Sequence, residues 1–249
     1  MIPFIRREKI LEILAMSDVV YIEDLVNVTG VSDATIRRDL KTLSDEGSVA
    51  LLSGGAAKLT DSTGEKPLVE RVQINKDEKG MIGKYAASLV GDGDFIFIGP
   101  GTTENTMIKH LANKRITVVT NGAFHIASLI KYQIDAIILG GRIVNSIAVL
   151  SGPSAVEQVK KMHFDKCFIG GSGISVNGVL TTSEESVAII NSQAVQNSNA
   201  IYFLADSSKV GKESRFEFAR LEKHHVLITT KQKAKFSDNV TYIEVEPTI

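Results

Sequence analysis

From residue 95 onward, the chain carries a series of short apolar runs, each of strand length and each separated from the next by a longer stretch. Continuous apolar runs of this length are typical of strands that are buried on both faces of a sheet. The pattern predicts an α/β domain with a mainly parallel sheet covered by helices, including helices over residues 76–90 and near 104–112. The expected strands are residues 95–98, 116–119, 136–139, 166–169, 200–204, 226–228 and 242–245.

Small, hydroxyl or amide residues follow five of these strands in turn. In open α/β sheets, ligands bind beyond the carboxyl ends of the strands. Residues 101–103 lead into a helix and offer amides and hydroxyls to an anion, while Lys209 and Arg142 add positive charge. Glu184 or Glu185 would bind sugar hydroxyls or act as a base. In any single loop, tight turns and helix caps explain these residues, but the set favours a site for a small phosphorylated polyol.

The expected effector-binding residues are Gly101, Thr102, Thr103, Thr120, Asn121, Gly141, Arg142, Gly171, Ser172, Thr181, Thr182, Glu184 and Lys209.

Residues 30–43 predict a turn followed by a basic amphipathic helix. Gly30 permits a positive φ, and Ser32 is a good N-cap whose hydroxyl would accept a hydrogen bond from the amide of residue 34 or 35. Residues 36, 40 and 43 share one apolar face, and the opposite face is cationic and hydrogen-bonding. Such a face suits a helix in the major groove of DNA, although an ordinary surface helix has the same pattern. The expected DNA-binding residues are Ser32, Asp33, Ala34, Thr35, Arg37, Arg38, Lys41 and Thr42.

The segments around this helix complete a small domain. Helices expected over residues 5–16 and 22–28 make it part of a helix-turn-helix, and residues 48–59 predict a hairpin that forms the wing of a winged helix. The polar stretch at 60–67 is the best linker in the chain. We therefore expect a winged helix-turn-helix DNA-binding domain over 1–58, a linker over 59–75 and an α/β effector-binding domain over 76–249.

The charge balance constrains any binding to DNA. The whole chain has a net charge of −1, and residues 1–60 carry seven Lys or Arg against nine Asp or Glu. A DNA-binding face in such a domain needs its cations gathered on one side and its acids turned away. Phosphate contacts per subunit would still be few, so useful affinity predicts a homodimer or homotetramer.

Several other classes of protein are disfavoured by the sequence. An apolar run of 18 or more residues is missing, which argues against a membrane span, and the start of the chain lacks the features of a signal peptide. Cys167 is the single cysteine and fits a reducing cytoplasm. The five histidines show no metal-ligand spacing, and the chain has no phosphate-binding loop or dinucleotide fingerprint. We expect a cytoplasmic protein without a metal or a cofactor.

Motifs over nearly the whole chain carry a family likeness. In the first domain they are residues 6–10, 22–25, 31–40 and 54–56, among which Thr-Ile-Arg-Arg-Asp-Leu at 35–40 is the most specific. In the second they are Glu78-Lys79, Gly101-Thr102-Thr103, Thr120-Asn121, Gly140-Gly141, Leu180-Thr181-Thr182 and Asp206-Ser207-Ser208-Lys209. Together these motifs resemble the DeoR family of bacterial transcription regulators.

The resemblance implies a winged helix joined to a sensor domain related to ribose-5-phosphate isomerase and glucosamine-6-phosphate deaminase. It also implies a repressor of a sugar-catabolism operon that binds double-stranded operator DNA and is released by a phosphorylated sugar. Residues 97–103, 208–213 and 242–246 look most like lactose phosphotransferase-system repressors, whose inducer would be tagatose 6-phosphate or a related sugar phosphate. The alternative is a sugar-phosphate isomerase or deaminase with an accessory N-terminal domain, and fold alone does not decide between them. The first 58 residues favour the regulator.

Two positions depart from the family pattern. Many relatives have an acidic residue near position 99, where this chain has Gly99-Pro100. The wing of many relatives carries Arg and His just before its Gly-Gly pair, where this chain has Leu51 and Ser53. We therefore expect the cations of residues 37–41 to supply much of the attraction to DNA phosphates.

Overall fold

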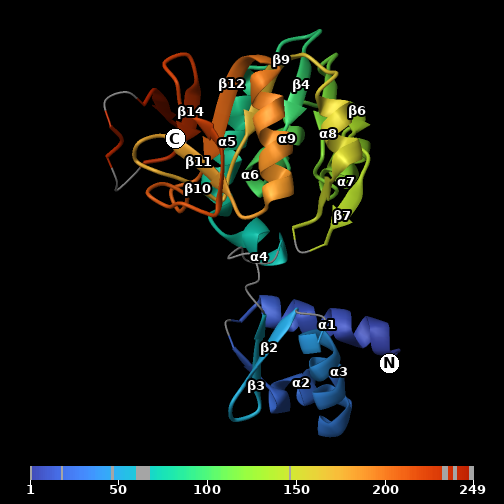
Figure 1. Cartoon of the computed structure of the whole chain (residues 1–249). Coiled ribbons are helices and arrows are strands. Elements are labelled where there is room, and N and C mark those ends of the chain that lie inside the picture. The colour runs from blue at the N-terminus through green and yellow to red at the C-terminus, as the bar shows by residue number, and fades with distance from the viewer. Residues whose placement is uncertain are drawn as a thin grey trace. The chain divides into compact units, whose positions relative to one another are not determined.

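The structure, a computed structural model, describes residues 2–17, 19–45, 48–59, 68–145, 147–231, 235–237 and 240–246. The chain divides into two compact units, Met1–Gln73 and Ile74–Ile249, whose elements are labelled in Figure 1. Residues 60–67 of the expected linker lie outside the described residues. The segment that follows them, Leu68–Gln73, forms helix α4.

The first unit is a three-helix domain with a small antiparallel sheet in the order β1-β3-β2. Its helices lie close to the predicted ranges, and Gly30 ends α2 with a φ of 70°. The predicted wing is the β2–β3 hairpin, whereas the short strand β1 was not expected. The predicted helix end at Gly47 lies outside the described residues. The elements are α1 (Pro3–Ala15), β1 (Val20–Tyr21), α2 (Ile22–Thr29), α3 (Asp33–Asp45), β2 (Val49–Leu52) and β3 (Ala56–Leu59).

A buried ion pair joins α1 to α3 in this unit. Arg6 donates from Nε to Asp39 Oδ2 at 2.5 Å and from Nη2 to Asp39 Oδ1 at 3.2 Å. Both residues are buried, with 8% and 5% of their surface exposed. The apolar side chains of α3 pack into the same core, which includes Ile10, Leu14 and Leu25. The pair therefore turns one acid of α3 inward, away from the solvent face of that helix.

The second unit is built on a seven-stranded sheet in the order β15-β14-β12-β9-β4-β5-β6, and all its pairings are parallel. This confirms the predicted α/β class, and each of the seven apolar runs falls on one of these strands. The strands are β4 (Phe95–Ile98), β5 (Thr117–Thr120), β6 (Asp135–Ile138), β9 (Phe164–Ile169), β12 (Ser198–Ala205), β14 (Val226–Thr229) and β15 (Tyr242–Glu244).

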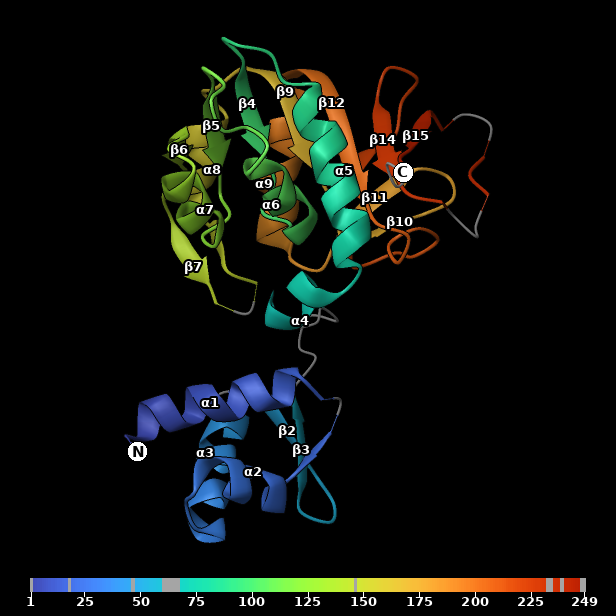
Figure 2. The same cartoon turned by 180° about the vertical axis from the view of Figure 1, so that it is seen from behind.

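Helices cover both faces of this sheet, so alternate residues of its central strands enter two separate cores. Along β4, Phe97 belongs to the core beneath α8 and α9, and Ile96 and Ile98 belong to the core beneath α5, α6 and α7. Figure 1 shows the α8–α9 side and Figure 2 the α5–α6 side. The helices are α5 (Lys76–Ser88), α6 (Thr102–Ile108), α7 (His125–Lys131), α8 (Pro153–Val159) and α9 (Glu185–Gln196).

Short antiparallel strands that the sequence did not indicate complete the unit. They form a hairpin of β7 with β8 and a second small sheet in the order β10-β11-β13. Among the described residues, no helix is long and apolar enough to cross a membrane. The additional strands are β7 (Arg142–Val144), β8 (Val149–Ser151), β10 (Gly173–Ile174), β11 (Val179–Thr182) and β13 (Phe216–Arg220).

The buried pair predicts that two acids of α3, Asp39 and Asp45, contribute differently to the stability of the first unit. Asp39→Ala leaves the Arg6 guanidinium buried without its carboxylate, so we expect a clear fall in the melting temperature of the first unit. Asp45→Ala, at an exposed position of the same helix, is the matched control and should change it little. Scanning calorimetry of the full chain measures both variants. Equal melting temperatures would show that the pair does not hold α1 against α3.

Candidate functional site

Helix α3, with Ser32 directly before it, contains all eight residues that were expected to contact DNA. Ser32, Asp33, Ala34 and the three cations are exposed, and Thr35 and Thr42 are half-buried. The apolar face of the same helix is buried, as its spacing predicted. At the start of the helix, the Ser32 carbonyl accepts hydrogen bonds from the amides of residues 35 and 36. The Ser32 hydroxyl lies 2.9 Å from the Thr35 hydroxyl, which is its described partner in place of the backbone amide that we expected.

Two exposed acids, Asp33 and Asp45, remain on the cationic face of α3. Arg37 donates to both oxygens of Asp33, from Nε at 2.6 Å and from Nη2 at 3.2 Å. This hydrogen-bonded carboxylate raises the pKa of the Arg37 guanidinium, and both side chains stay more than half exposed. The expectation that the acids are turned away therefore holds for Asp39 and is wrong for Asp33 and Asp45. Arg38 and Lys41 carry the rest of the positive charge on this face.

The second unit has its topological switch point between β4 and β9. After β4 the chain continues to β5 and β6 on one side, and it then returns to place β9 on the other side. Gly99, just beyond β4, still donates its amide to the Phe168 carbonyl of β9 at 2.8 Å. The loops beyond these two strands then diverge, which is where open α/β sheets bind ligands.

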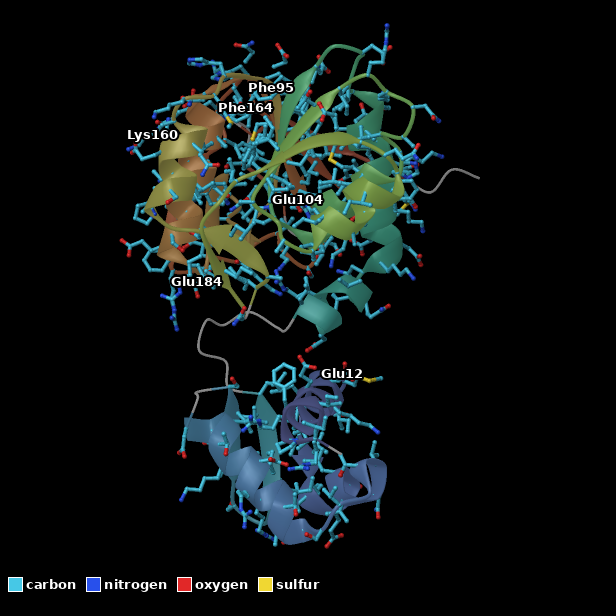
Figure 3. The ribbon with its side chains drawn as sticks, turned by 90° about the vertical axis from the view of Figure 1, so that its right-hand side faces the viewer. Glu12, Phe95, Glu104, Lys160, Phe164 and Glu184 are labelled. Carbon is cyan, nitrogen blue, oxygen red and sulfur yellow. The ribbon has the colours of Figure 1, made fainter. Side chains whose placement is uncertain are left out.

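The Glu104 carboxyl group occupies this switch point. Its Oε1 accepts the amide of Gly170 at 2.5 Å, and only 2% of the residue is exposed. A Cβ atom on Gly101 would overlap the carboxyl group, and one on Gly170 or Gly99 would lie 2.9 or 3.2 Å from Oε1. Three glycines thus leave the space that the carboxyl group fills. Figure 3 shows Glu104 in the interior of the unit, with Phe95 and Phe164 together near the other end of β4 and β9.

Burial gives this carboxyl group an unusual acidity. Loss of hydration raises the pKa of Glu104 to about 7, although its own amide, the Gly170 amide and the charges of Lys79 and Lys209 all act to lower it. Lys79, on α5, is itself 3% exposed. A carboxyl group with this pKa changes its protonation state near neutral pH.

A second set of polar contacts lies beyond β12 and β14. Glu78 of α5 accepts hydrogen bonds from the amide and hydroxyl of Ser207 and from the Thr230 hydroxyl, at 2.6–2.9 Å. Asp206 Oδ1 accepts from Asn75 and from Ser208. Asp206 is fully buried, and its Oδ2 has no hydrogen-bond partner among the described residues.

A buried histidine links the loop after β5 to the loop after β4. The His125 Nδ1 lies 3.2 Å from the Thr120 hydroxyl, and its Nε2 lies 3.2 Å from the Gly101 carbonyl. Because the carbonyl only accepts, Nε2 carries the proton and Nδ1 accepts from Thr120, whose oxygen in turn accepts the Gly122 amide at 3.1 Å. Burial lowers the pKa of His125 to about 4, so the ring is neutral at physiological pH. This chain of bonds positions Gly101 and occupies the Thr120 hydroxyl.

Five of the other predicted effector residues fall into two groups, Gly171, Ser172 and Thr181 in one and Gly141 and Arg142 in the other. Near the β9 loop, the Ser172 amide donates to the Thr181 carbonyl and the Thr181 hydroxyl donates to the Gly173 carbonyl, with Gly171 packed against Thr181. Near β5, Gly141 packs against Ser151, which pairs with the exposed Arg142.

Three further expected residues have differing surroundings. Asn121 Oδ1 is buried with no described hydrogen-bond partner, Thr182 is buried, and Glu184 is the half-buried N-cap of α9. A cavity of about 520 Å³ between α9 and β13 has none of the thirteen expected residues in its lining.

Sequence reasoning missed several residues at the switch point. It chose the small and hydroxyl residues after each strand and passed over Glu78, Lys79, Glu104 and His125 as ligand-site residues. Glu78-Lys79 were quoted as a motif without a role. The acid at 104 directly follows Gly101-Thr102-Thr103 and was the available clue, because an acid beside glycines after a buried strand lies at the ligand-binding end of the sheet.

Elsewhere, ligand atoms of Glu222, His224 and His225 lie within 4.8 Å of one another, close enough to hold a metal ion. The His225 Nδ1 already accepts the Glu222 amide at 3.1 Å.

Comparison with known families now identifies both units. Residues 6–62 match the DeoR-like helix-turn-helix domain, and residues 74–231 match the DeoR C terminal sensor domain. The chain belongs to the DeoR family.

Among its relatives is a protein named Uncharacterized HTH-type transcriptional regulator FruR, from Bacillus subtilis, which is 35% identical over 94% of this chain and 93% of its own length. The Lactose phosphotransferase system repressor of Lactococcus lactis is 33% identical over 91% of each chain. The HTH-type transcriptional repressor GlcR of B. subtilis is 32% identical over 89% and 86%.

Solved structures give weaker likenesses. Ribose 5-phosphate isomerase A from Methanocaldococcus jannaschii is similar over 55% of each chain, with 20% identity and a TM-score of 0.42. The eIF2B delta protein of Chaetomium thermophilum is similar over 88% of this chain and 65% of its own, with 11% identity and a TM-score of 0.47.

Two substitutions on α3 should have opposite effects on the affinity for DNA. Arg38→Ala removes an exposed cation, so binding to DNA should weaken and the slope of log K against log salt should become shallower by about 1. Asp33→Asn releases Arg37, so affinity for any duplex should rise and the slope should steepen by about 1. Salt-controlled gel shifts measure both. Asp45→Asn, at an exposed position on the same helix, is the control for a simple change of charge.

The buried carboxyl group predicts how stability depends on pH. Glu104 has a pKa of about 7 in the folded chain against an unperturbed 4.5, so the folded state holds the proton more tightly. The stability from this group is fully present below pH 4.5 and is lost as the pH rises through 7. Glu104→Gln cannot ionise, so it does not lose this stability. The free energy of unfolding of the variant minus that of the wild type should therefore increase by on the order of 3 kcal/mol as the pH rises from 4.5 to 8.

Urea unfolding of the full chain at several pH values measures this gain. Glu157→Gln is the matched control, because Glu157 lies exposed on α8 beside Lys160, whose hydrogen bond lowers the pKa of that carboxyl. A constant difference between Glu104→Gln and the wild type across this range would contradict the assignment.

Proposed function

We propose that this protein is a transcriptional repressor of a sugar-catabolism operon that is released from its operator by a phosphorylated sugar. One observation carries the proposal. This member of a regulator family has both an exposed cationic helix, α3, suited to be a DNA-recognition helix, and an α/β unit with lysines at its switch point. We propose no enzymatic activity and no cofactor.

The DNA side of the proposal rests on α3. The exposed Arg38 and Lys41 are suited to phosphates and base edges in a major groove, and the helix begins with the small residues Ser32 and Ala34. So few cations make few phosphate contacts, which favours a homodimer or homotetramer. A symmetric oligomer would place two reading helices at half-sites about 34–36 Å apart.

The ligand side rests on the charges and hydroxyl groups beyond the strands. Lys79 and Lys209 supply positive charge for a phosphate. Arg142, which follows the loop after β6, is exposed and adds another cation. Hydroxyl and carboxylate groups around them suit the oxygens of a polyol. Because relatives at 30–33% identity are named lactose phosphotransferase system repressors, tagatose 6-phosphate is the first inducer to test.

Induction is then a matter of linkage. The protein has a DNA-binding arrangement and an arrangement that does not bind DNA. A sugar phosphate with higher affinity for the second arrangement shifts the population toward it. The shift cannot exceed the difference between its two affinities. By the same linkage, operator DNA weakens the binding of the sugar phosphate by an equal factor.

The enzyme alternative has one observation in its favour. Glu104 has a pKa of about 7, a value that suits a general base, at the ligand-binding end of an α/β sheet. Asp206, the acid directly after β12, already accepts hydrogen bonds from Asn75 and Ser208 at its Oδ1. The full chain should therefore be assayed for turnover of ribose 5-phosphate, fructose 6-phosphate and glucosamine 6-phosphate, and turnover of any of them would overturn the regulator proposal.

Two binding experiments test the repressor directly. Duplexes selected by the full chain from a random pool should show a two-fold repeated half-site, and tagatose 6-phosphate should release them in a gel shift. In a thermal-shift panel of sugar phosphates, an inducer at 100 times its Kd should stabilise the chain by about 2.7 kcal/mol. A panel in which no sugar phosphate stabilises the chain or releases the duplex would reject the proposed inducer class.

A further inference from the structure

The first turn of α5 is fastened to two loops at the ligand-binding end of the sheet. Glu78 Oε2 accepts the Ser207 amide at 2.8 Å and the Thr230 hydroxyl at 2.6 Å, and Glu78 Oε1 accepts the Ser207 hydroxyl at 2.9 Å. Ser207 lies beyond β12 and Thr230 lies beyond β14, and these two strands are neighbours in the sheet. One carboxylate therefore holds the start of a helix against the carboxyl ends of two parallel strands.

A further hydrogen bond holds the residue directly before this helix. Asn75 has a φ of 51°, in the left-handed region that asparagine adopts more readily than most residues. Its Nδ2 donates to Asp206 Oδ1 at 2.8 Å, and the same oxygen accepts the amide and the hydroxyl of Ser208. Because Asp206 is fully buried, it gives Asn75 a fixed partner. We use the name α5 clamp for Asn75, Glu78, Asp206, Ser207 and Thr230.

The α5 clamp lies directly after the boundary between the two units. Helix α4, the last helix of the first unit, ends at Gln73, and α5 begins at Lys76. The two residues between these helices, Ile74 and Asn75, reach at most about 7 Å when fully extended. A larger displacement of the first turn of α5 must therefore be passed on to α4.

The loop that the clamp holds also carries a cation. Lys209 is half-buried, its amide donates to the Asp206 carbonyl at 3.0 Å, and its charge acts on the Glu104 carboxyl group at the switch point. The Lys209 carbonyl in turn accepts the Ile174 amide of β10 at 3.0 Å. A ligand that draws Lys209 toward itself therefore acts on a short loop that is bonded to α5 at its other end.

We propose that the α5 clamp couples the ligand site of the second unit to the DNA-binding unit, with Glu78 as its central positioning residue. A phosphate group bound by Lys209 moves the loop over residues 206–209. The hydrogen bonds of Ser207 and Asp206 pass this movement to the start of α5, and the two-residue connection passes it to α4. This inference rests on the proposed function and adds to it the residues through which a bound sugar phosphate changes the affinity for DNA.

The coupling factor is the quantity that tests this role. It is the Kd of the full chain for a duplex selected from the random pool, measured by gel shift at saturating tagatose 6-phosphate, divided by the Kd without the sugar phosphate. Because the factor is a ratio, a variant that weakens DNA binding equally in both states leaves it unchanged. A merely structural role of the clamp therefore predicts the wild-type factor.

Two variants weaken the clamp in different places. Glu78→Ala removes all three bonds of the carboxylate, and Asn75→Gly removes the bond to Asp206 while glycine still allows a φ of 51°. Each should lower the coupling factor by about fivefold or more, which is the usual net strength of one hydrogen bond. Asp77→Asn, at an exposed position in the same turn of α5, is the matched control and should keep the wild-type factor.

Hydrogen exchange of the ligand-free chain tests the clamp by itself. Without Glu78, the Ser207 amide loses its acceptor and the start of α5 loses its attachment. Peptides that cover residues 74–79 and 206–209 should then exchange about fivefold faster than in the wild type. The Asp77→Asn variant should exchange as the wild type does.

The outcomes separate the inference from the proposed function. A wild-type coupling factor in both clamp variants overturns the coupling role and leaves the repressor in place. Unchanged hydrogen exchange in both variants overturns the inference as well, whichever sugar phosphate is used. A wild-type chain that no sugar phosphate of the panel releases from DNA overturns the proposed function and the inference together. If Glu78→Ala does not fold, Asn75→Gly decides by the same two measurements.

Discussion

The second unit is organised around the point in its parallel sheet where the order of the strands reverses. Because β4 lies between β5 and β9, the chain must leave β4 on one side and come back on the other, and the loops beyond β4 and β9 separate. The space between them is filled by a side chain from the first turn of α6, which brings a carboxyl group to the Gly170 amide. The glycines at 99, 101 and 170 follow from that choice, since larger residues would meet the carboxyl group. Fold topology thus sets both the place of Glu104 and the small residues around it.

The parts of this fold that could be predicted are those that depend on local pattern. Continuous apolar runs marked all seven strands of the large sheet, and the spacing of Ile36, Leu40 and Leu43 gave the orientation of α3. The missed strands are short and paired with distant segments, so their sequences carry little periodicity. The pairing of Asp33 with Arg37 and the place of Glu104 depend on side-chain geometry. The residues chosen after each strand included Lys209 but not Lys79 or Glu104, because nothing in the local pattern shows which charged side chains the fold brings together.

The two units dispose of their charges in different ways. In the first, Arg6 and Asp39 neutralise each other inside the domain, and Asp33 engages Arg37 on its surface. A domain with more acids than cations therefore presents a small positive face made chiefly by Arg38 and Lys41. In the second unit, the lysines at the switch point face a carboxyl group whose pKa of about 7 lets its charge vary at neutral pH. Charge is fixed where DNA is read and adjustable where a ligand is expected.

The surface pair on α3 also bears on how a regulator finds its site. A repressor spends most of its search on non-operator DNA, which it holds through phosphate contacts alone. Every cation withheld from those contacts shortens each stay and lets the protein sample more of the genome in a given time. Arg37 lies 2.6 Å from Asp33 on the exposed face. If α3 binds DNA as proposed, this pair would limit the unspecific hold and would exchange for a base or phosphate contact at the correct sequence. A single carboxylate at the start of the reading helix would thereby set the speed of the search.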